Sequence, residues 1–183
     1  MFTQGPWQQT PCGFGPVAIY LLYLNELDIV STVIQFVLGM FAWSFSEYFL
    51  HRFVFHAEHS WLPDDPTVIA FHFLLNGNHH AFPQDPLRLT FPFVPGCIVL
   101  YLFGGLPWSF VVPQQSYNAF MAGWLFAYIV FEMLHYISHF ASVRNNILLR
   151  FKELHSRHHY KQWKLGFGIS TPLFDWVFNT ELK

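Results

Sequence analysis

Charged residues and cysteines are both scarce in this 183-residue sequence. Asp, Glu, Lys and Arg make up only 11% of it, about half the share of a soluble domain, whereas hydrophobic residues reach 53%. This balance favours a membrane protein over a soluble one. The only cysteines are Cys12 and Cys97, so the sequence provides neither a disulfide framework nor a CxxC metal-binding pair.

Positive charge is missing from the first quarter of the sequence and forms no long run elsewhere. The net charge is −2 with histidine neutral, which argues against a nucleic-acid-binding surface, and we expect no nucleic-acid partner. Because no Lys or Arg precedes Arg52, the N-terminus lacks the basic segment of a secretory signal. We therefore expect the spanning helices to direct insertion. The length suits a single domain, residues 1–183.

Two long stretches without charge predict membrane crossings. Residues Ile29 to Ser46 suffice for one crossing of about 30 Å of hydrocarbon. Residues Leu89 to Phe131 suffice for two crossings of about 20 residues each, with a polar turn at Pro113 to Ser116 between them. A shorter apolar piece, Gly13 to Leu24, is either re-entrant or part of a fourth crossing. The sequence thus predicts an all-α integral membrane protein with about four transmembrane or re-entrant helices.

The basic residues predict how these helices are oriented. Every Lys and Arg from Arg52 to Lys164 falls in segments that the three-crossing layout places on one face. The positive-inside rule makes that face cytosolic. Two further helices are predicted there, one over Thr67 to His80, opened by Pro66, and one over Ser142 to Tyr160. Together they form a cytosolic helical cap.

Nine of the eleven histidines form four clusters on the same face. They are His51 and His56; His79 and His80; His135 and His139; and His155, His158 and His159. Neutral imidazole is the commonest metal ligand, and polar rings at a membrane border are costly without a partner. The clusters therefore predict a metal centre. Nine candidates are too many for one ion and suit two, and imidazole ligation leaves iron, zinc, copper and nickel open.

The spacing within the clusters indicates which rings can share an ion. His135 and His139 are four residues apart and lie on one helix face, as do the histidines of the last cluster. His51 and His56 are five apart, about 140° around an ideal helix. Both can bind one ion only if the helix distorts or ends between them; alternatively, they serve different ions.

Other polar residues lie close to the histidines. Glu47 and Glu132 each precede a histidine by about one turn. Each either accepts the second N–H of a ligating ring and fixes its tautomer, or extends into the water interface. Tyr136, next to His135, is a third candidate for a place behind the ligands. For His72, core packing and an auxiliary ligand role are both open.

Five motifs follow one another in a specific order. They are Glu47 to His56, His72 to His80, His135-Tyr136 with His139-Phe140, His155 to His159, and Gly166 to Thr171 followed by Asp175. In this order they resemble the fatty acid hydroxylase superfamily, and more narrowly the fatty acid 2-hydroxylases without the cytochrome b5 domain. The likeness runs from about Phe41 to the C-terminus, with a histidine-rich core over residues 47–178.

The resemblance implies a multi-pass enzyme of the endoplasmic reticulum membrane, or of the inner membrane in a bacterium, with its histidine site facing the cytosol. The nine clustered histidines would bind two metal ions, iron in the active enzyme, with zinc a possible occupant in purified protein. The enzyme would hydroxylate carbon 2 of a long-chain acyl group, as free acid, acyl-CoA or ceramide, for sphingolipid synthesis. It would use dioxygen and electrons from a separate cytochrome b5 and its reductase.

The sequence departs from the family pattern at Asn76, where the family has a tenth histidine. Asn76 could bind through its carbonyl oxygen or a water, or His72, one turn back, could compensate. The first spanning region is also short, which leaves the fourth crossing open.

Two other functions stay open at this point. One is a related hydroxylase of sterols, alkanes or carotenoids, or a desaturase; the tail from Gly166 to Thr171 favours the acyl 2-hydroxylase. The other is a non-catalytic metal-binding relative, because of Asn76.

Overall fold

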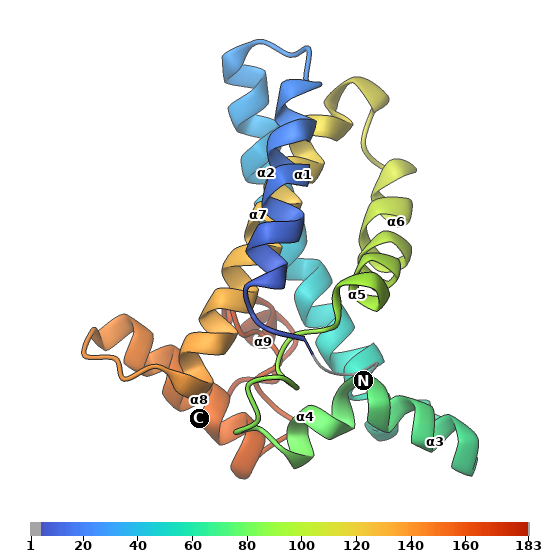
Figure 1. Cartoon of the computed structure of the whole chain (residues 1–183), viewed down its shortest axis with the longest axis vertical. Helices are drawn as coiled ribbons and strands as arrows, with labels where there is room; N and C mark the ends of the chain where they lie inside the picture. The colour runs from blue at the N-terminus through green and yellow to red at the C-terminus, as the bar shows by residue number, and fades with distance from the viewer. Residues whose placement is uncertain (1–4, 183) are drawn as a thin grey trace.

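The computed structural model describes residues 5–182, without the side chain of His59, and all regular structure in this range is helical (Figure 1). The elements are α1 (Gln9–Tyr23), α2 (Ile29–Leu50), η1 (His51–Phe55), η2 (Ala57–His59), α3 (Pro66–His72), η3 (Phe73–Gly77), α4 (Asn78–Ala81), α5 (Phe93–Leu100), η4 (Tyr101–Gly105), α6 (Leu106–Ser109), α7 (Gln114–Phe140), α8 (Asn146–Tyr160) and α9 (Leu173–Val177). Of these, η1, η3 and η4 are π-helical and η2 is a 3-10 turn. The all-α prediction is confirmed.

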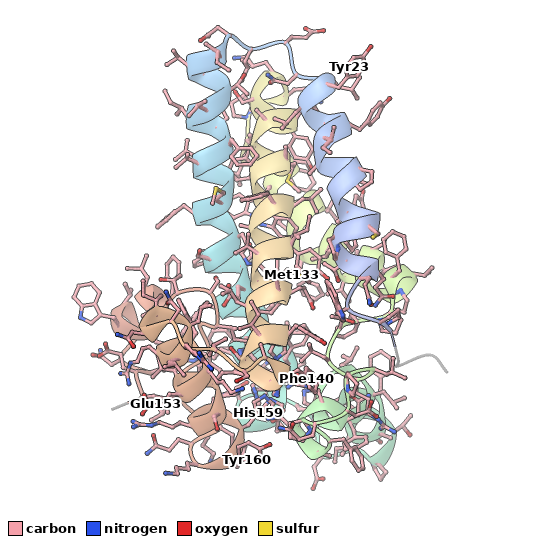
Figure 2. The ribbon with its side chains drawn as sticks, turned by 60° about the vertical axis from the view of Figure 1, so that its left-hand side comes forward. Tyr23, Met133, Phe140, Glu153, His159 and Tyr160 are labelled. Atoms are coloured by element: carbon pink, nitrogen blue, oxygen red, sulfur yellow. The ribbon has the colours of Figure 1, made fainter. Side chains whose placement is uncertain are left out.

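Helices α1, α2 and α7 stand side by side as an upright bundle, and the arm formed by α5, η4 and α6 stands beside them (Figures 1 and 2). Helices α3, α4, α8 and α9 gather at the lower end of the bundle (Figure 1). Two helical stretches, residues 29–55 and 114–140, are long and apolar enough to cross a membrane. Each has 27 residues, about 40 Å at 1.5 Å per residue.

Helices α2 and α7 approach each other closely because each carries a glycine at the contact. A Cβ at Gly39 would lie 1.9 Å from the Phe120 carbonyl oxygen, and one at Gly123 would lie 2.0 Å from that of Phe36. Small residues let helix backbones touch in this way within membranes. Below this contact Trp124 is fully buried, and its Nε1 donates to Ser46 Oγ at 3.2 Å.

The outer face of α2 is apolar and exposed. Val30, Val33, Val37 and Phe41 recur every three or four residues and are all more than half exposed. Such a stripe is unfavourable in water but suits contact with lipid chains. The arm of α5 and α6 is also apolar, at 17 residues, and α1 lies along α7 at 15 residues.

Both long helices continue beyond the uncharged stretches of the sequence. Helices α2 and α7 run past Ser46 and Phe131 to Leu50 and Phe140, and the next residues, Glu47 and Glu132, are buried and do not turn toward water. The turn predicted at Pro113 to Ser116 lies three residues earlier, at residues 110–113, and Gln114 to Ser116 begin α7. The cap helix predicted from Ser142 begins at Asn146.

Candidate metal centre

The nine clustered histidines come together at the lower end of the bundle, from η1 and the residue that follows it, α4, α7 and α8. They form two groups, and within each group the candidate ligand atoms all lie within 4.8 Å of one another. The five-histidine group comprises His79, His135, His139, His155 and His159, and the four-histidine group comprises His51, His56, His80 and His158. The structure thus brings together the residues predicted as ligands, while their role as ligands stays a prediction.

In the five-histidine group the Nε2 atoms converge. His79 Nε2 lies 3.1 Å from those of His135 and His159, and His155 Nε2 lies 2.8 Å from that of His139 and 3.0 Å from that of His159. A neutral Nε2 carries either one hydrogen or one lone pair. Three of these atoms have two close neighbours each, so ordinary hydrogen bonds do not satisfy the arrangement.

A metal ion accounts for this convergence. Zinc–imidazole bonds are about 2.0–2.1 Å long, and two ligand nitrogens at right angles around such an ion lie about 3 Å apart. The observed separations of 2.8 to 3.1 Å match that spacing. Nine imidazoles in two compact groups therefore fit two metal ions.

The four-histidine group depends on a π-turn. In η1 the His56 amide donates to the His51 carbonyl at 3.0 Å, an i to i+5 bond that brings residues five apart onto one face. The rings of His51 and His56 are therefore 5.0 Å apart, and His56 Nε2 lies 3.1 Å from His158 Nε2. Of the alternatives left by the sequence, the helix distorts, and both histidines join one group.

Three Nδ1 atoms of the four-histidine group, those of His51, His56 and His158, have defined partners. His51 Nδ1 donates to the Phe167 carbonyl at 2.6 Å, and His158 Nδ1 donates to the Leu165 carbonyl at 2.8 Å. A carbonyl only accepts, so these bonds place the hydrogen on Nδ1 and leave the Nε2 lone pair for a metal. His56 Nδ1 lies 3.1 Å from the Glu58 carboxylate.

The five-histidine group has less support of this kind, although His139 forms a hydrogen bond with the backbone of Pro83. The Nδ1 atoms of His79, His155 and His159 are buried and form no hydrogen bond with residues 5–182. Burial, and then the neighbouring His135, holds the pKa of both His79 and His155 well below the usual value. Their rings are therefore neutral at pH 7, which is the form that binds metal.

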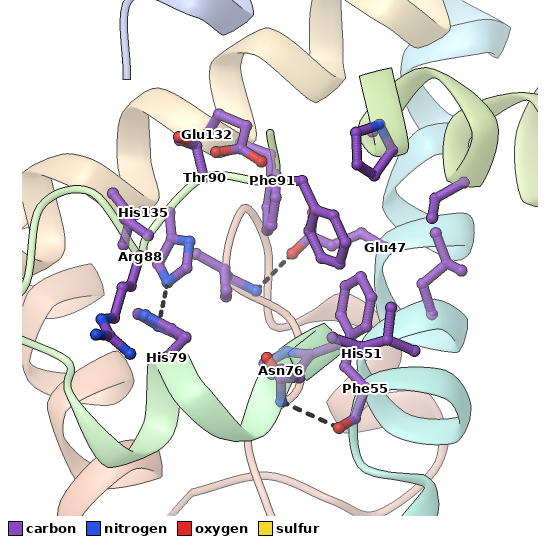
Figure 3. A pocket seen from close by; sticks show the side chains of 18 of the residues that line it. Glu47, His51, Phe55, Asn76, His79, Arg88, Thr90, Phe91, Glu132 and His135 are labelled. Carbon is purple, nitrogen blue, oxygen red and sulfur yellow. Dashed lines mark hydrogen bonds between the residues drawn. The ribbon is translucent and has the colours of Figure 1, made fainter. Parts of the chain in front are cut away.

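The carboxylates predicted behind the ligands differ in their contacts. Glu47 accepts from the backbone N–H groups of Ile169 and Ser170 at 2.5 and 2.8 Å and from the Ser170 hydroxyl, so it holds the C-terminal tail (Figure 3). Glu132 is buried on α7, where it bonds with Tyr128, and its Oε2 has no partner among the described residues.

The remaining auxiliary candidates lie outside both groups. Asn76 Nδ2 donates to the Phe55 carbonyl at 3.0 Å, which ties η3 to η1 (Figure 3). His72 Nε2 lies 3.1 Å from Glu58, so it stands behind that carboxylate and not beside an ion. Tyr136 packs against Trp7, with ring centroids 5.2 Å apart.

Sequence reasoning missed the groups that orient the four-histidine rings. Glu58 follows His56 by two residues, and a carboxylate so close to a ligand was an available signal. The Leu165 and Phe167 carbonyls belong to the backbone and leave no signal in residue type.

A cavity of about 400 Å³ adjoins the histidine groups and extends between α2, α5 and α7. Its walls are largely apolar, with Trp43, Leu50, Leu100, Tyr128 and Phe131 among them, and at its other end it meets histidines of both groups (Figure 3). The arrangement can place an alkyl chain beside two metal ions.

The family model described as fatty acid hydroxylase matches residues 36–180. The chain belongs to the fatty acid hydroxylase family. This confirms the resemblance inferred from the motif order. Within the family, the chain is 40% identical over 204 residues to a fatty acid 2-hydroxylase of Mus musculus, covering 98% of this chain and 53% of that protein.

Two yeast comparisons extend the similarity over the whole chain. The chain is 35% identical to the ceramide very long chain fatty acid hydroxylase SCS7 of Saccharomyces cerevisiae, covering 98% of this chain and 47% of that protein. The solved structure of full-length scs7p, in which only the hydroxylase domain is visible, superposes with a TM-score of 0.92 at 34% identity and covers 100% of this chain and 69% of that one.

The curated relatives are longer than this fatty acid hydroxylase family member. The chain covers 38% of the length of the human fatty acid 2-hydroxylase, to which it is 40% identical over 146 residues, and about half of the mouse and yeast proteins.

Proposed function

We propose that this chain is a membrane-bound dimetal oxygenase that hydroxylates carbon 2 of a long-chain fatty acyl group. The observation that carries the proposal is the pair of histidine groups beside an apolar cavity of about 400 Å³. The names of the relatives, fatty acid 2-hydroxylase and dihydroceramide fatty acyl 2-hydroxylase, support both the substrate class and the carbon attacked.

The two histidine groups hold the two ions, iron in the working enzyme. When bound, these ions would supply the activation of dioxygen, which the reaction requires because replacing a C–H bond by C–OH is an oxidation that no side chain of the site can carry out. The imidazoles keep the ions at the end of the cavity. The apolar walls around Trp43 and Phe131 exclude water from the reacting carbon.

The cavity also suggests how carbon 2 is selected. Carbon 2 neighbours the acyl carbonyl, so the polar head must stop near the ions while the alkyl chain fills the apolar part. Arg88 and Asn78 line the same cavity as His79 and carry N–H donors suited to an acyl carbonyl (Figure 3). The substrate is a free acid, an acyl-CoA or a ceramide.

The proposed location is the endoplasmic reticulum membrane, or the inner membrane in a bacterium. Helices α1, α2 and α7 and the arm from Phe93 to Ser109 form the membrane part, and α3, α4, α8 and α9 form a cytosolic cap. The basic residues after Arg52, which fall at the cap end, support this orientation. Electrons come from cytochrome b5 and its reductase.

The test uses the full chain purified in detergent, loaded with iron and supplied with cytochrome b5, its reductase and a long-chain acyl substrate. We expect about two ions per chain by elemental analysis and a 2-hydroxy acyl product by mass spectrometry. No product from any acyl or sterol substrate, with two ions bound, would refute the enzyme. One ion or none in the unaltered chain would refute the dimetal site.

A second candidate is a metal-binding relative without turnover, which the contact of Asn76 with the Phe55 carbonyl favours. Under this alternative the unaltered chain is inactive, and Asn76→His restores hydroxylation together with metal content. Activity in the unaltered chain excludes it.

A further inference from the structure

The C-terminal loop from Leu165 to Ser170 lies directly against the four-histidine group. Its carbonyls at Leu165 and Phe167 accept from His158 and His51, two rings on different helices. The Phe167 ring is buried and lies 5.7 Å from the His51 ring and 5.9 Å from the His158 ring. One loop therefore orients two of the four imidazoles.

Two buried carboxylates hold this loop from the opposite side. Asp175, on α9, accepts from the Phe167 N–H at 2.9 Å and the Gly168 N–H at 2.7 Å. Glu47, on α2, accepts from the next two N–H groups, those of Ile169 and Ser170. Four successive backbone donors thus bind two carboxylates, each of which is 3% exposed or less.

These anchors leave the loop little freedom. Gly166 adopts a φ of +73°, and its amide donates to the Thr180 carbonyl at 2.8 Å, which fixes the turn between the Leu165 and Phe167 carbonyls. Thr180 Oγ1 also donates to Asp175 at 2.7 Å. With its N–H groups held by carboxylates, the loop presents the Leu165 and Phe167 carbonyls to the histidines.

We propose that Asp175 and Glu47 are positioning residues for the four-histidine ion, acting through this loop. They fix the Nδ1 hydrogens of His51 and His158, and each Nε2 lone pair then faces the ion. The inference rests on the proposed metal-binding function. Its effect is confined to one ion, because the loop forms no hydrogen bond with His79, His155 or His159 at Nδ1.

The experiment compares the unaltered full chain with Asp175→Asn in detergent. The amide keeps the shape of the side chain but places an NH₂ group against a backbone N–H, so one loop anchor is lost. Glu181→Gln is the matched control, because Glu181 is an exposed carboxylate near the same segment that accepts none of these N–H groups. Metal-free protein is titrated with Co²⁺, and visible absorption follows the two binding steps.

We expect two binding steps in the unaltered chain and in Glu181→Gln. In Asp175→Asn we expect one step to weaken by about 10- to 100-fold, the range measured for partners of metal ligands, while the other step is unchanged. The milder Ser170→Ala, which removes one donor to Glu47, should weaken the same step to a smaller extent and serves if Asp175→Asn yields little folded protein.

The outcomes separate this inference from the proposed function. Fewer than two steps in the unaltered chain refutes the dimetal site itself. Two unchanged steps in both loop variants refute the positioning role. Equal weakening of both steps in the loop variants also refutes it, since the loop would then support the whole cap and not one ion.

Discussion

The two histidine groups hold their rings in place by different means. The four-histidine group has fewer imidazoles, yet His51, His56 and His158 each have a hydrogen-bonding partner at Nδ1. The five-histidine group has one more imidazole, but three of its Nδ1 atoms form no hydrogen bond with the described residues. Hydrogen bonds therefore orient most rings of the four-histidine group, whereas the five-histidine group has three rings without such a bond and relies more on the number and packing of its rings.

This difference predicts that the two histidine groups respond unequally to substitutions of the histidines and of the residues behind them. A group with four predicted ligands has none to spare, because four is the usual number around a structural zinc ion. A group with five ligands can lose one and keep four. Conversely, changes behind the ligands should affect mainly the group that uses hydrogen bonds to orient its rings.

The largest expected effect comes from removing one ligand from each group. His158→Ala leaves three imidazoles in its group, whereas His139→Ala leaves four. We expect about one ion per chain and no detectable hydroxylation in His158→Ala, but about two ions, one of them more weakly bound, in His139→Ala. Elemental analysis after gel filtration measures the metal content per chain. Equal metal loss in both variants would contradict the proposed difference between the two histidine groups.

A smaller effect is expected from Glu58, whose carboxylate lies 3.1 Å from both His56 Nδ1 and His72 Nε2. Glu58→Gln should weaken the four-histidine ion by about 10- to 100-fold and leave the other ion unchanged. Metal titration of the metal-free protein measures both affinities. Glu153→Gln is the control, because Glu153 is an exposed carboxylate on α8 that pairs with Arg150 and Arg157. Weakening of the five-histidine ion would contradict the assignment.

The smallest expected effect comes from the cap of helix α8, and it should weaken the binding of both ions equally. Helix α8 carries ligands of each group, and its first turn is capped by Asn145, which accepts from the amides of Ile147 and Leu148 at 2.9 and 3.2 Å. Asn145→Ala should cost about 1 kcal/mol of stability, with both ions weakened to the same small extent. Denaturant unfolding and metal titration are the measurements. Selective loss of one ion would show that α8 does not act as a common support.

Much of the candidate site follows from the sequence, because its signals are local. Imidazoles three or four residues apart share a helix face, and four such clusters at the ends of apolar stretches have few other uses. The motif order then identified the family. The turn before α7 was predicted for the same reason, since Pro113 and its polar neighbours interrupt a long apolar run.

The rest depends on contacts between distant segments. An ideal helix separates His51 from His56, and only the folded chain shows the π-turn that joins them. For Glu47 and Glu132 the sequence left open a place behind a ligand or in the water interface, and only the folded chain shows that Glu47 is buried against the tail and Glu132 beside Tyr128. No pattern of side-chain types indicates that the Phe167 carbonyl orients a histidine ring.

The close contact of α2 with α7 has a consequence far from where it occurs. Gly39 and Gly123 each precede the first histidine of their own helix by 12 residues, about 18 Å along the axis. The glycine contact therefore sets the distance between the two helices, and with it the separation of His51 and His135 at their lower ends. A methyl group at either glycine would push the two helices apart, so we expect Gly39→Ala or Gly123→Ala to separate the histidines and lower metal binding without altering any imidazole.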